Sequence, residues 1–311
     1  MARSSLTTTS ADVLAHWVTR SHEILKSAVY LKALHVAGWL LSIVCAISLV
    51  APASASPPLT EATNDVGSAP LAREFLRDVS PLLFVPVDES KAYAVRLQRA
   101  LDSAQVQLNS PQFVVLIDRS ANVQAALIYW GSVAQGWSLV GAAPASTGLP
   151  GSYEHFTTPL GVFDHSLMNP DFRAEGTKNK LGFRGYGRKG MRVYDFGWVD
   201  APRGWGEGAM GILRLQMHDT DPDRAELRLG TAQSEGCVRI PSALNDFIDR
   251  HALLDAGYER AVADGTHLWV LRTDRTPTST PGRYLVVVDS ERKERPTWAP
   301  LPSLPSIRNK R

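Results

Sequence analysis

Short strand-like segments separated by turn residues constrain the fold of this chain more than any other feature. FVVLID (113–118) and VQAALIYW (123–130) are apolar runs joined by the turn RSAN (119–122), which predicts a β-hairpin. Further strands are expected at 137–146, 191–198, 211–218, 267–272 and 284–290. Glycine and proline are frequent between residues 141 and 208, which argues against a helical bundle. The pattern predicts a mainly β domain over residues 110–275.

Two helices are expected beside these strands. Residues 88–104 place Tyr93, Leu97 and Leu101 on one face, and Asp88 is the expected cap. Residues 241–254 form the second helix, with Pro241 in its first turn. Residues 56–109 are thus interpreted as a linker and a packing helix. Residues 276–311 are interpreted as a last strand followed by a Pro-rich basic tail.

The N-terminal segment carries an export signal. Ala33 to Ala51 contains no Lys, Arg, Asp or Glu, and basic residues precede it. Ala53-Ser54-Ala55 follows as a small-x-small pattern, which is typical of a cleavage site. Residues 1–55 are therefore interpreted either as a signal peptide or as an uncleaved membrane anchor. Either interpretation exports the rest of the chain to the periplasm or cell envelope, and the second anchors it to the inner membrane.

Charge and cysteine content exclude some classes of protein. The net charge is +2, with no concentrated basic face of the kind that a nucleic-acid-binding protein needs. The chain has two cysteines, and Cys45 lies in the apolar N-terminal segment. After cleavage only Cys237 would remain, so no intramolecular disulfide could form. A lone thiol in an oxidising compartment is a liability unless it is buried or used.

Cys237 is the strongest candidate nucleophile. It follows a glycine in SEGCVRI (234–240) and precedes the expected helix 241–254, whose N-terminus could lower the thiol pKa and bind an oxyanion. His218 ends an expected strand and is the candidate base. The alternative is an inert core cysteine and a surface histidine. His155 and His165 fall in expected loops, where most histidines are solvated.

No metal or phosphate site is expected. The motif HDTD (218–221) combines one histidine with loop carboxylates, which is weak evidence for a metal. GYGRKG (185–190) does not stand between a strand and a helix as a phosphate-binding loop would, and it predicts a turn.

Three segments together resemble the YkuD-type L,D-transpeptidase catalytic domain. They are Ser146-Thr147-Gly148, the run Thr158-Pro159-Leu160-Gly161-Val162-Phe163, and His218 followed after 15 residues by Ser234 to Ile240. The resemblance covers residues 112–254. It implies a mainly β, L,D-transpeptidase-like β-sandwich with a helix after the catalytic cysteine. It also implies an exported peptidoglycan enzyme with no metal and no organic cofactor.

The resemblance also implies the reaction and its partners. In that family the cysteine attacks a peptidoglycan tetrapeptide stem at the bond before the terminal D-alanine, and a thioester forms. An amine from a second stem or from a protein then resolves the thioester, and water as acceptor would give carboxypeptidase action. The expected partners are therefore stem peptides and an amine or protein acceptor.

Roles for individual residues follow from the resemblance. Cys237 is the nucleophile, His218 the base, and the backbone carbonyl of Asp219 orients the imidazole. The N–H groups of Gly236 and Cys237 bind the oxyanion, and Ser234 and Arg239 shape the substrate site, which also includes Glu235.

Glu235 is a departure, because the family has histidine at that position. A carboxylate facing the sulfur would disfavour the thiolate, so Glu235 is expected to point away and to pair with Arg239 or with a basic residue of 183–192.

Two other functions fit the same segments. One is a cell-wall hydrolase, either an L,D-carboxypeptidase or an amidase-like enzyme. The other is an inactive wall-binding module that retains the fold. A sortase-like enzyme fits less well, because sortases take their arginine from a separate later strand, whereas Arg239 lies two residues after Cys237.

Overall fold

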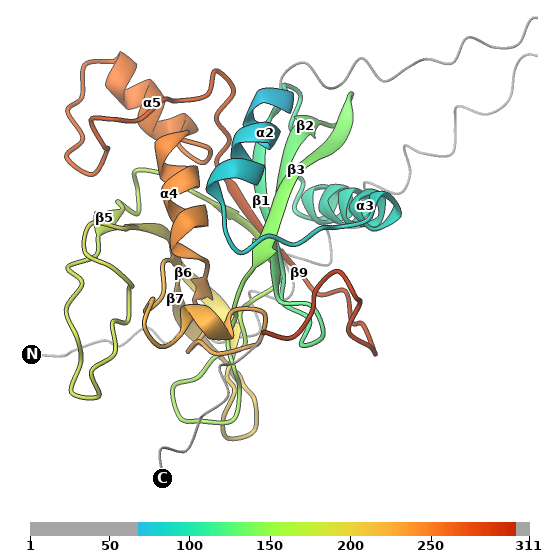
Figure 1. Cartoon of the computed structure of the whole chain (residues 1–311), viewed down its shortest axis with the longest axis vertical. Coiled ribbons are helices and arrows are strands. Elements are labelled where there is room, and N and C mark those ends of the chain that lie inside the picture. The colour runs from blue at the N-terminus through green and yellow to red at the C-terminus, as the bar shows by residue number, and fades with distance from the viewer. Residues whose placement is uncertain (1–67, 303–311) are drawn as a thin grey trace, which may run out of the picture. The chain divides into compact units, whose positions relative to one another are not determined.

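Two mixed β-sheets form the centre of the structure (Figure 1). The computed structural model describes residues 68–302. The expected signal peptide or anchor (1–55), most of the expected linker (56–67) and the end of the expected tail (303–311) lie outside these residues. The prediction of a mainly β protein with few helices is confirmed.

The first sheet has five strands in the order β3-β2-β1-β9-β4. Its strands are β1 (Gln112–Asp118), β2 (Ala125–Ser132), β3 (Gly136–Pro144), β4 (Gly161–Asp164) and β9 (Tyr284–Val288). The predicted hairpin is β1–β2, which pair antiparallel with Phe113 opposite Trp130. β9 pairs parallel to β1, although the two strands lie far apart in the chain.

 Val114 of β1 lies opposite Tyr284, and the last described strand is thus inserted between β1 and β4.

The second sheet has four strands in the order β5-β6-β7-β8. Its strands are β5 (Phe172–Arg173), β6 (Arg192–Pro202), β7 (Met210–His218) and β8 (Val238–Arg239). β6 and β7 pair antiparallel, with a bulge between Asp195 and Trp198. β8 is short and runs parallel to β7, which makes this sheet mixed as well.

The main core lies between the two sheets and is closed by two helices. Val115 of β1 and Met217 of β7 belong to the same buried cluster. The helices are α2 (Ala69–Asp78) and α4 (Ser242–Arg250), which meet through the rings of Phe75 and Phe247 with centroids 5.2 Å apart. Burial of these apolar side chains is the main force that holds the sheets together.

The first sheet is also covered on its other face. The helix α3 (Val87–Ser103) buries Tyr93, Leu97 and Leu101 there, as its apolar face predicts. Trp298 packs edge-on against Tyr93 with ring centroids 5.8 Å apart. Because both faces are covered, β1 and β2 are apolar along almost their whole length.

The ends of the helices differ from the sequence prediction. α3 begins at Val87 with Pro86 at its N-cap position, so Asp88 does not cap the helix but lies in its first turn, where its charge favours the helix dipole. α4 ends at Arg250, and a separate helix, α5 (Ala256–Ala263), follows it. Pro241 occupies the N-cap position of α4. Neither α5 nor α2 was predicted.

The C-terminal limit of the domain was predicted too early. Residues 267–272 form turns instead of a strand, because no strand of either sheet lies beside them in the described structure. β9 completes the first sheet, so the domain extends past residue 275. Up to residue 302 the chain does not form a free tail, since Trp298 and Ala299 are buried.

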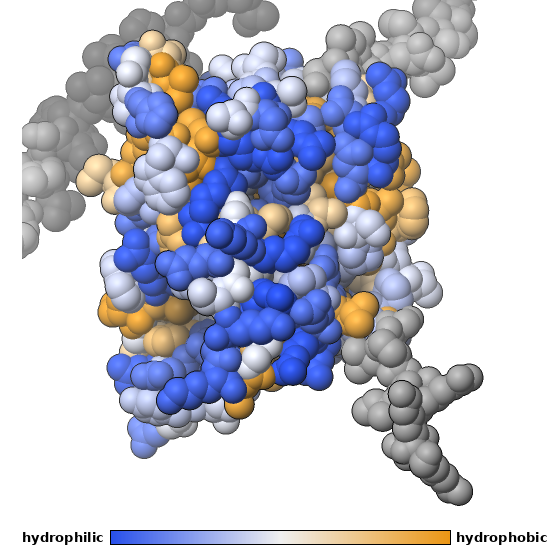
Figure 2. Space-filling view, turned by 60° about the vertical axis from the view of Figure 1, so that its left-hand side comes forward, coloured by the Kyte–Doolittle hydropathy of each residue, from blue (hydrophilic) through white to orange (hydrophobic). Residues whose placement is uncertain are grey.

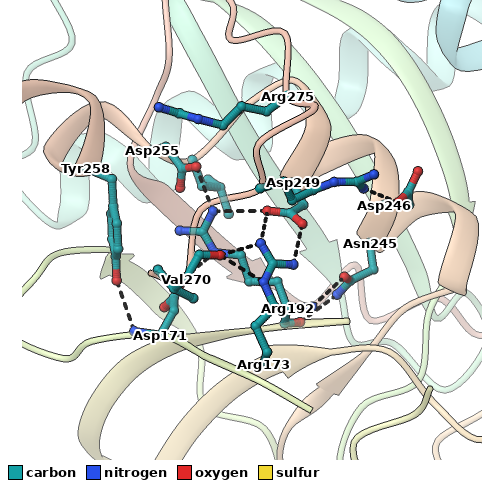
Figure 3. Close-up of polar contacts among 12 residues, drawn as sticks. Asp171, Arg173, Arg192, Asn245, Asp246, Asp249, Asp255, Tyr258, Val270 and Arg275 are labelled. Carbon is teal, nitrogen blue, oxygen red and sulfur yellow. Dashed lines mark hydrogen bonds and ion pairs between the residues drawn. The ribbon is translucent and has the colours of Figure 1, made fainter. Parts of the chain in front are cut away.

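A buried ion network joins α4 and the start of α5 to the second sheet (Figure 3). Arg192 is fully buried and contacts Asp171 and Asp255 at 2.7 Å and Asp249 at 3.3 Å. His165, expected in a solvated loop, is also fully buried, and its Nε2 lies 2.9 Å from Asp171. Burial alone would lower the pKa of His165, but the Asp171 carboxylate outweighs it and raises that pKa.

The surface combines a hydrophilic area with separate apolar patches. Figure 2 shows one face on which hydrophilic residues form a broad area and apolar residues gather beside it. On the second sheet, Trp198, Met210 and Ile212 are exposed large apolar side chains. Among residues 68–302, no helix has the length and apolar character needed to cross a bilayer.

Candidate active site

His218 and Cys237 are brought together by a short parallel ladder. His218 ends β7, and Cys237 directly precedes β8. The ladder pairs His218 with Arg239. Residues that lie opposite each other point to the same face, and so do side chains two residues apart in a strand. One face of the second sheet therefore carries Gln216, His218 and Arg239, and Cys237 places its sulfur at the adjoining edge of β7.

The Cys237 thiol is partly buried at the edge of β7. Its Sγ lies 3.8 Å from the Arg214 carbonyl oxygen, and the Gln216 backbone N–H donates to the sulfur. Burial raises the pKa of the Cys237 thiol to about 11, whereas the Gln216 N–H and the Arg239 guanidinium act in the opposite direction. The protonated thiol is therefore the resting form at neutral pH.

The helix N-terminus expected to lower this pKa does not lie at the cysteine. β8 separates Cys237 from α4, which begins at Ser242. The Ser242 backbone N–H donates to the Glu226 carboxylate at 3.0 Å. Because the effect of a helix terminus falls off within one turn, α4 does not offset the burial of the thiol.

His218 is buried and is held in one tautomer. Its Nδ1 donates a hydrogen bond to the Asp219 backbone carbonyl, the contact that the family resemblance implied. A carbonyl oxygen can only accept, so Nδ1 carries the proton and Nε2 keeps its lone pair. Burial, helped by the Arg239 charge, lowers the pKa of His218 to about 4. The imidazole is therefore neutral at neutral pH and can act as a base.

The loop 183–190, of which residues 185–190 were predicted as a turn, packs against this imidazole. The Tyr186 ring meets His218 edge-on with centroids 4.9 Å apart, and its hydroxyl donates to Gln216 Oε1 at 2.9 Å. Gly187 has a φ of +80°, and a Cβ there would lie 2.4 Å from the Asp219 carboxylate. Only glycine therefore lets the loop approach β7 so closely.

The carboxylates of the HDTD motif hold this loop in place. The Asp219 carboxylate accepts a hydrogen bond from the Arg188 N–H at 3.0 Å, and the Asp221 carboxylate accepts one from the Arg184 N–H at 2.7 Å. Both side chains are fully buried. Within residues 68–302 no group of three or more His, Cys, Asp or Glu side chains could hold a metal ion. In this structure the motif positions a loop.

The turn before the cysteine is held by Ser234. Its hydroxyl donates to the Cys237 carbonyl at 2.5 Å and accepts a hydrogen bond from the Gly236 N–H at 3.1 Å. Gly236 has a φ of +135°, and a Cβ there would lie 2.9 Å from the Leu213 side chain. Ser234 and Gly236 therefore fix the direction in which the thiol is presented.

The upstream segments of the resemblance meet the cysteine turn. The Thr158 hydroxyl donates to the Gly236 carbonyl at 2.7 Å and accepts a hydrogen bond from the Gly148 N–H at 2.8 Å. Gly148 forms a bridge with Ser234, and Ser146 forms one with Arg239. Segments that lie far apart in the sequence thus support the same turn.

The two expected oxyanion donors differ in availability. The Gly236 N–H is already bonded to Ser234, so it is not free to bind an oxyanion in this arrangement. In the described part of the chain, no acceptor lies within hydrogen-bond distance of the Cys237 N–H. Cys237 is therefore the one available donor of the expected pair.

Glu235 and Arg239 do not form the expected pair. Glu235 is exposed, and within residues 68–302 its carboxylate makes no ion pair. Its charge nevertheless acts on the sulfur and contributes to the raised pKa of Cys237, after burial. The Arg239 guanidinium lies over the Phe183 ring at 5.5 Å and donates to the Gln233 carbonyl at 3.3 Å. The prediction that Glu235 pairs with Arg239 or with a basic residue of 183–192 is wrong.

Three residues at the site were missed by sequence reasoning. They are Tyr186, Phe183 and Gln216. Tyr186 lies in the segment interpreted only as a turn (185–190) and Phe183 lies just before it, and nothing in their spacing shows that the loop reaches β7. Gln216 could have been found, because it lies two residues before His218 in a strand and so shares its face.

The raised pKa of the thiol predicts slow alkylation. At pH 8 we expect Cys237 to react with iodoacetamide about a hundredfold more slowly than an ordinary exposed thiol, and its rate to keep rising up to about pH 11. The measurement is mass spectrometry of the peptide that contains Cys237, with glutathione as the reference thiol. A rate that levels off below pH 8 would show instead that the thiolate is the resting form.

The site combines a thiol, a neutral imidazole with a free Nε2 and an unpaired backbone N–H. These are the groups that acyl transfer through a thioester requires. A scan against models of protein families and a search of curated proteins found no match to this chain. What the site can do therefore follows from its own residues.

Proposed function

We propose that the protein is an exported peptidoglycan L,D-transpeptidase that acts through a cysteine thioester. In this proposal the two mixed sheets and α4 correspond to the β-sandwich and following helix of that family. The observation that carries the proposal is the hydrogen bond from His218 Nδ1 to the Asp219 carbonyl. It leaves Nε2 as a base on β7, and the pairing of β7 with β8 brings His218 and Cys237 together. The contacts that join Thr158 and Gly148 to the cysteine turn support it as well.

The first half of the reaction forms the acyl-enzyme. Cys237 Sγ attacks the stem carbonyl that precedes the terminal D-alanine, and its proton passes to His218 Nε2. The Cys237 N–H stabilises the oxyanion of the tetrahedral intermediate. When the intermediate collapses, the carbon–nitrogen bond breaks, and the D-alanine amine leaves with the proton from His218. Because the thiol and the imidazole are both neutral at rest, proton transfer accompanies the attack.

The second half consumes the thioester. An amine from another stem or from a protein attacks the thioester carbonyl, and Cys237 leaves as the thiol after taking back a proton through His218. The Arg239 Nε is buried and has no partner among the described residues. In this proposal the Arg239 guanidinium binds a carboxylate of the stem peptide. The expected apolar export segment (33–51) delivers the enzyme to this substrate.

Product analysis with purified disaccharide tetrapeptides tests the proposal. We expect release of D-alanine, dimers with new 3→3 cross-links, and an acyl adduct on the peptide that contains Cys237. Release of D-alanine without dimers would identify a carboxypeptidase. If there is neither an adduct nor any product, the site is inactive and the wall-binding alternative replaces the proposal.

Glu235 is expected to act on the acceptor side of the reaction. Its exposed carboxylate attracts a cationic amine, so Glu235→Gln is expected to raise the acceptor KM about two- to fivefold at low salt. D-Alanine release should not slow, because removing the negative charge does not hinder thiolate formation. Glu235→His tests the family residue at the same position.

The matched control is Glu294→Gln, which removes another exposed carboxylate. It is expected to leave the acceptor KM unchanged. The measurement is the ratio of cross-linked to hydrolysed product at several acceptor and salt concentrations. Identical acceptor dependence in wild type and Glu235→Gln would assign Glu235 no part in acceptor selection.

A further inference from the structure

The edge of β7 next to the sulfur has no partner strand along most of its length. β6 pairs with one edge of β7 from Met210 onward. β8 pairs with the other edge only at Met217 and His218. In the described structure, residues 210–215 make no backbone–backbone hydrogen bonds outside the pairing with β6. Unpaired strand edges are templates for the backbone of another chain.

The sulfur shows which backbone groups of β7 face this edge. Sγ lies between the Arg214 carbonyl, at 3.8 Å, and the Gln216 N–H, which donates to it. It thus occupies the place that the backbone of a neighbouring strand would take. The hairpin of β6 and β7 is consistent with this. The Arg203 N–H donates to the Ala209 carbonyl, so odd-numbered residues of β7 direct their backbone groups to β6 and even-numbered residues direct theirs to the free edge.

The next backbone pair along the same edge is free. It consists of the Ile212 carbonyl and the Arg214 N–H, which lie one repeat of the strand, about 7 Å, from the groups that hold the sulfur. Within residues 68–302 neither group has a hydrogen-bond partner. An extended peptide bonded to this pair would bring its following backbone carbonyl to the sulfur.

Side chains beside the free pair are exposed and suited to contact a peptide. Ile212 is 60% exposed and Trp198 is 67% exposed. The Arg214 guanidinium lies 5.7 Å from the centre of the Trp198 ring and is held by Asp195 at 2.7 Å. This arrangement holds the indole beside Arg214, on the same face of the sheet as Ile212. In strand addition, backbone hydrogen bonds give affinity and alternate side chains give specificity.

We propose that the acyl-donor stem peptide binds as an added strand on the edge of β7. One of its N–H groups donates to the Ile212 carbonyl, and one of its carbonyls accepts from the Arg214 N–H. This inference rests on the proposed function, and it adds that the donor is recognised through its main chain. A second copy of this chain on the same edge is the competing occupant.

Donors with one amide replaced by an ester test the first hydrogen bond. Each non-scissile amide of a tetrapeptide donor is replaced in turn, which removes one N–H at a time. We expect one replacement to lower kcat/KM about tenfold and the others to have little effect. Equal activity of all the ester donors would overturn the inference, while D-alanine release from the unmodified donor would leave the proposed function standing.

Arg214→Pro and its control Arg214→Ala test the second hydrogen bond. Both variants remove the side chain, but only proline removes the N–H, which does not bond to β6. Arg214→Pro is expected to have a kcat/KM about tenfold below that of Arg214→Ala, with an unchanged circular dichroism spectrum. If Arg214→Pro does not fold, the ester donors still decide the inference. If proline changes only the association state of the chain, the edge binds a second copy and the inference is wrong.

Discussion

Replacement of Cys237 by serine is expected to lower kcat/KM for D-alanine release by about 10⁴-fold or more. A serine hydroxyl is far less acidic than a thiol, and the proposed base is His218, whose pKa is lowered to about 4. A base this weak can assist a thiol but not a hydroxyl. The measurement is single-turnover release of D-alanine from a purified tetrapeptide donor, with mass spectrometry of the acyl adduct.

The other cysteine of the chain provides the matched control. Cys45→Ser is expected to keep full activity, because Cys45 lies in the apolar N-terminal segment. The Cys237→Ser protein should have the unfolding temperature of wild type, since a hydroxyl can donate to the Arg214 carbonyl as the thiol does. Turnover within tenfold of wild type would place the nucleophile elsewhere.

Arg192→Met is expected to lower the free energy of unfolding by about 3–5 kcal/mol. Arg192 is fully buried, and three aspartates bind its guanidinium (Figure 3). Methionine fills a similar volume but removes the guanidinium charge that compensates the buried carboxylates, and burying an uncompensated charge is costly. The measurement is chemical denaturation followed by tryptophan fluorescence and circular dichroism.

An exposed ion pair provides the control for this loss. Arg77 contacts Asp78 at 2.7 Å, but its side chain is 67% exposed. Arg77→Met is expected to leave the denaturation midpoint unchanged, because water and salt screen such pairs. If Arg192→Met were as stable as this control, the buried network would not contribute to the stability of the domain.

Most strands of the two sheets could be predicted from the sequence, but one late segment, residues 267–272, was wrongly predicted as a strand. β1 and β2 are apolar runs that one turn joins, so local pattern alone predicts their pairing. Residues 267–272 show the same kind of apolar run but form turns. A strand needs a neighbouring edge for its hydrogen bonds, and local sequence does not show which edges are open.

The mainly β class, the hairpin and the choice of His218 and Cys237 as candidates could all be predicted before the structure was known. These depend on local patterns and on residue chemistry. The folded structure was needed to show that the Glu235 carboxylate makes no ion pair within residues 68–302, that the Gly236 N–H is already bonded and that Tyr186 packs on His218. It also decided that the thiol is protonated at rest, because burial raises its pKa. The reason is physical: hydrogen-bond partners, burial and the fields of nearby charges arise between segments that meet only when the chain folds.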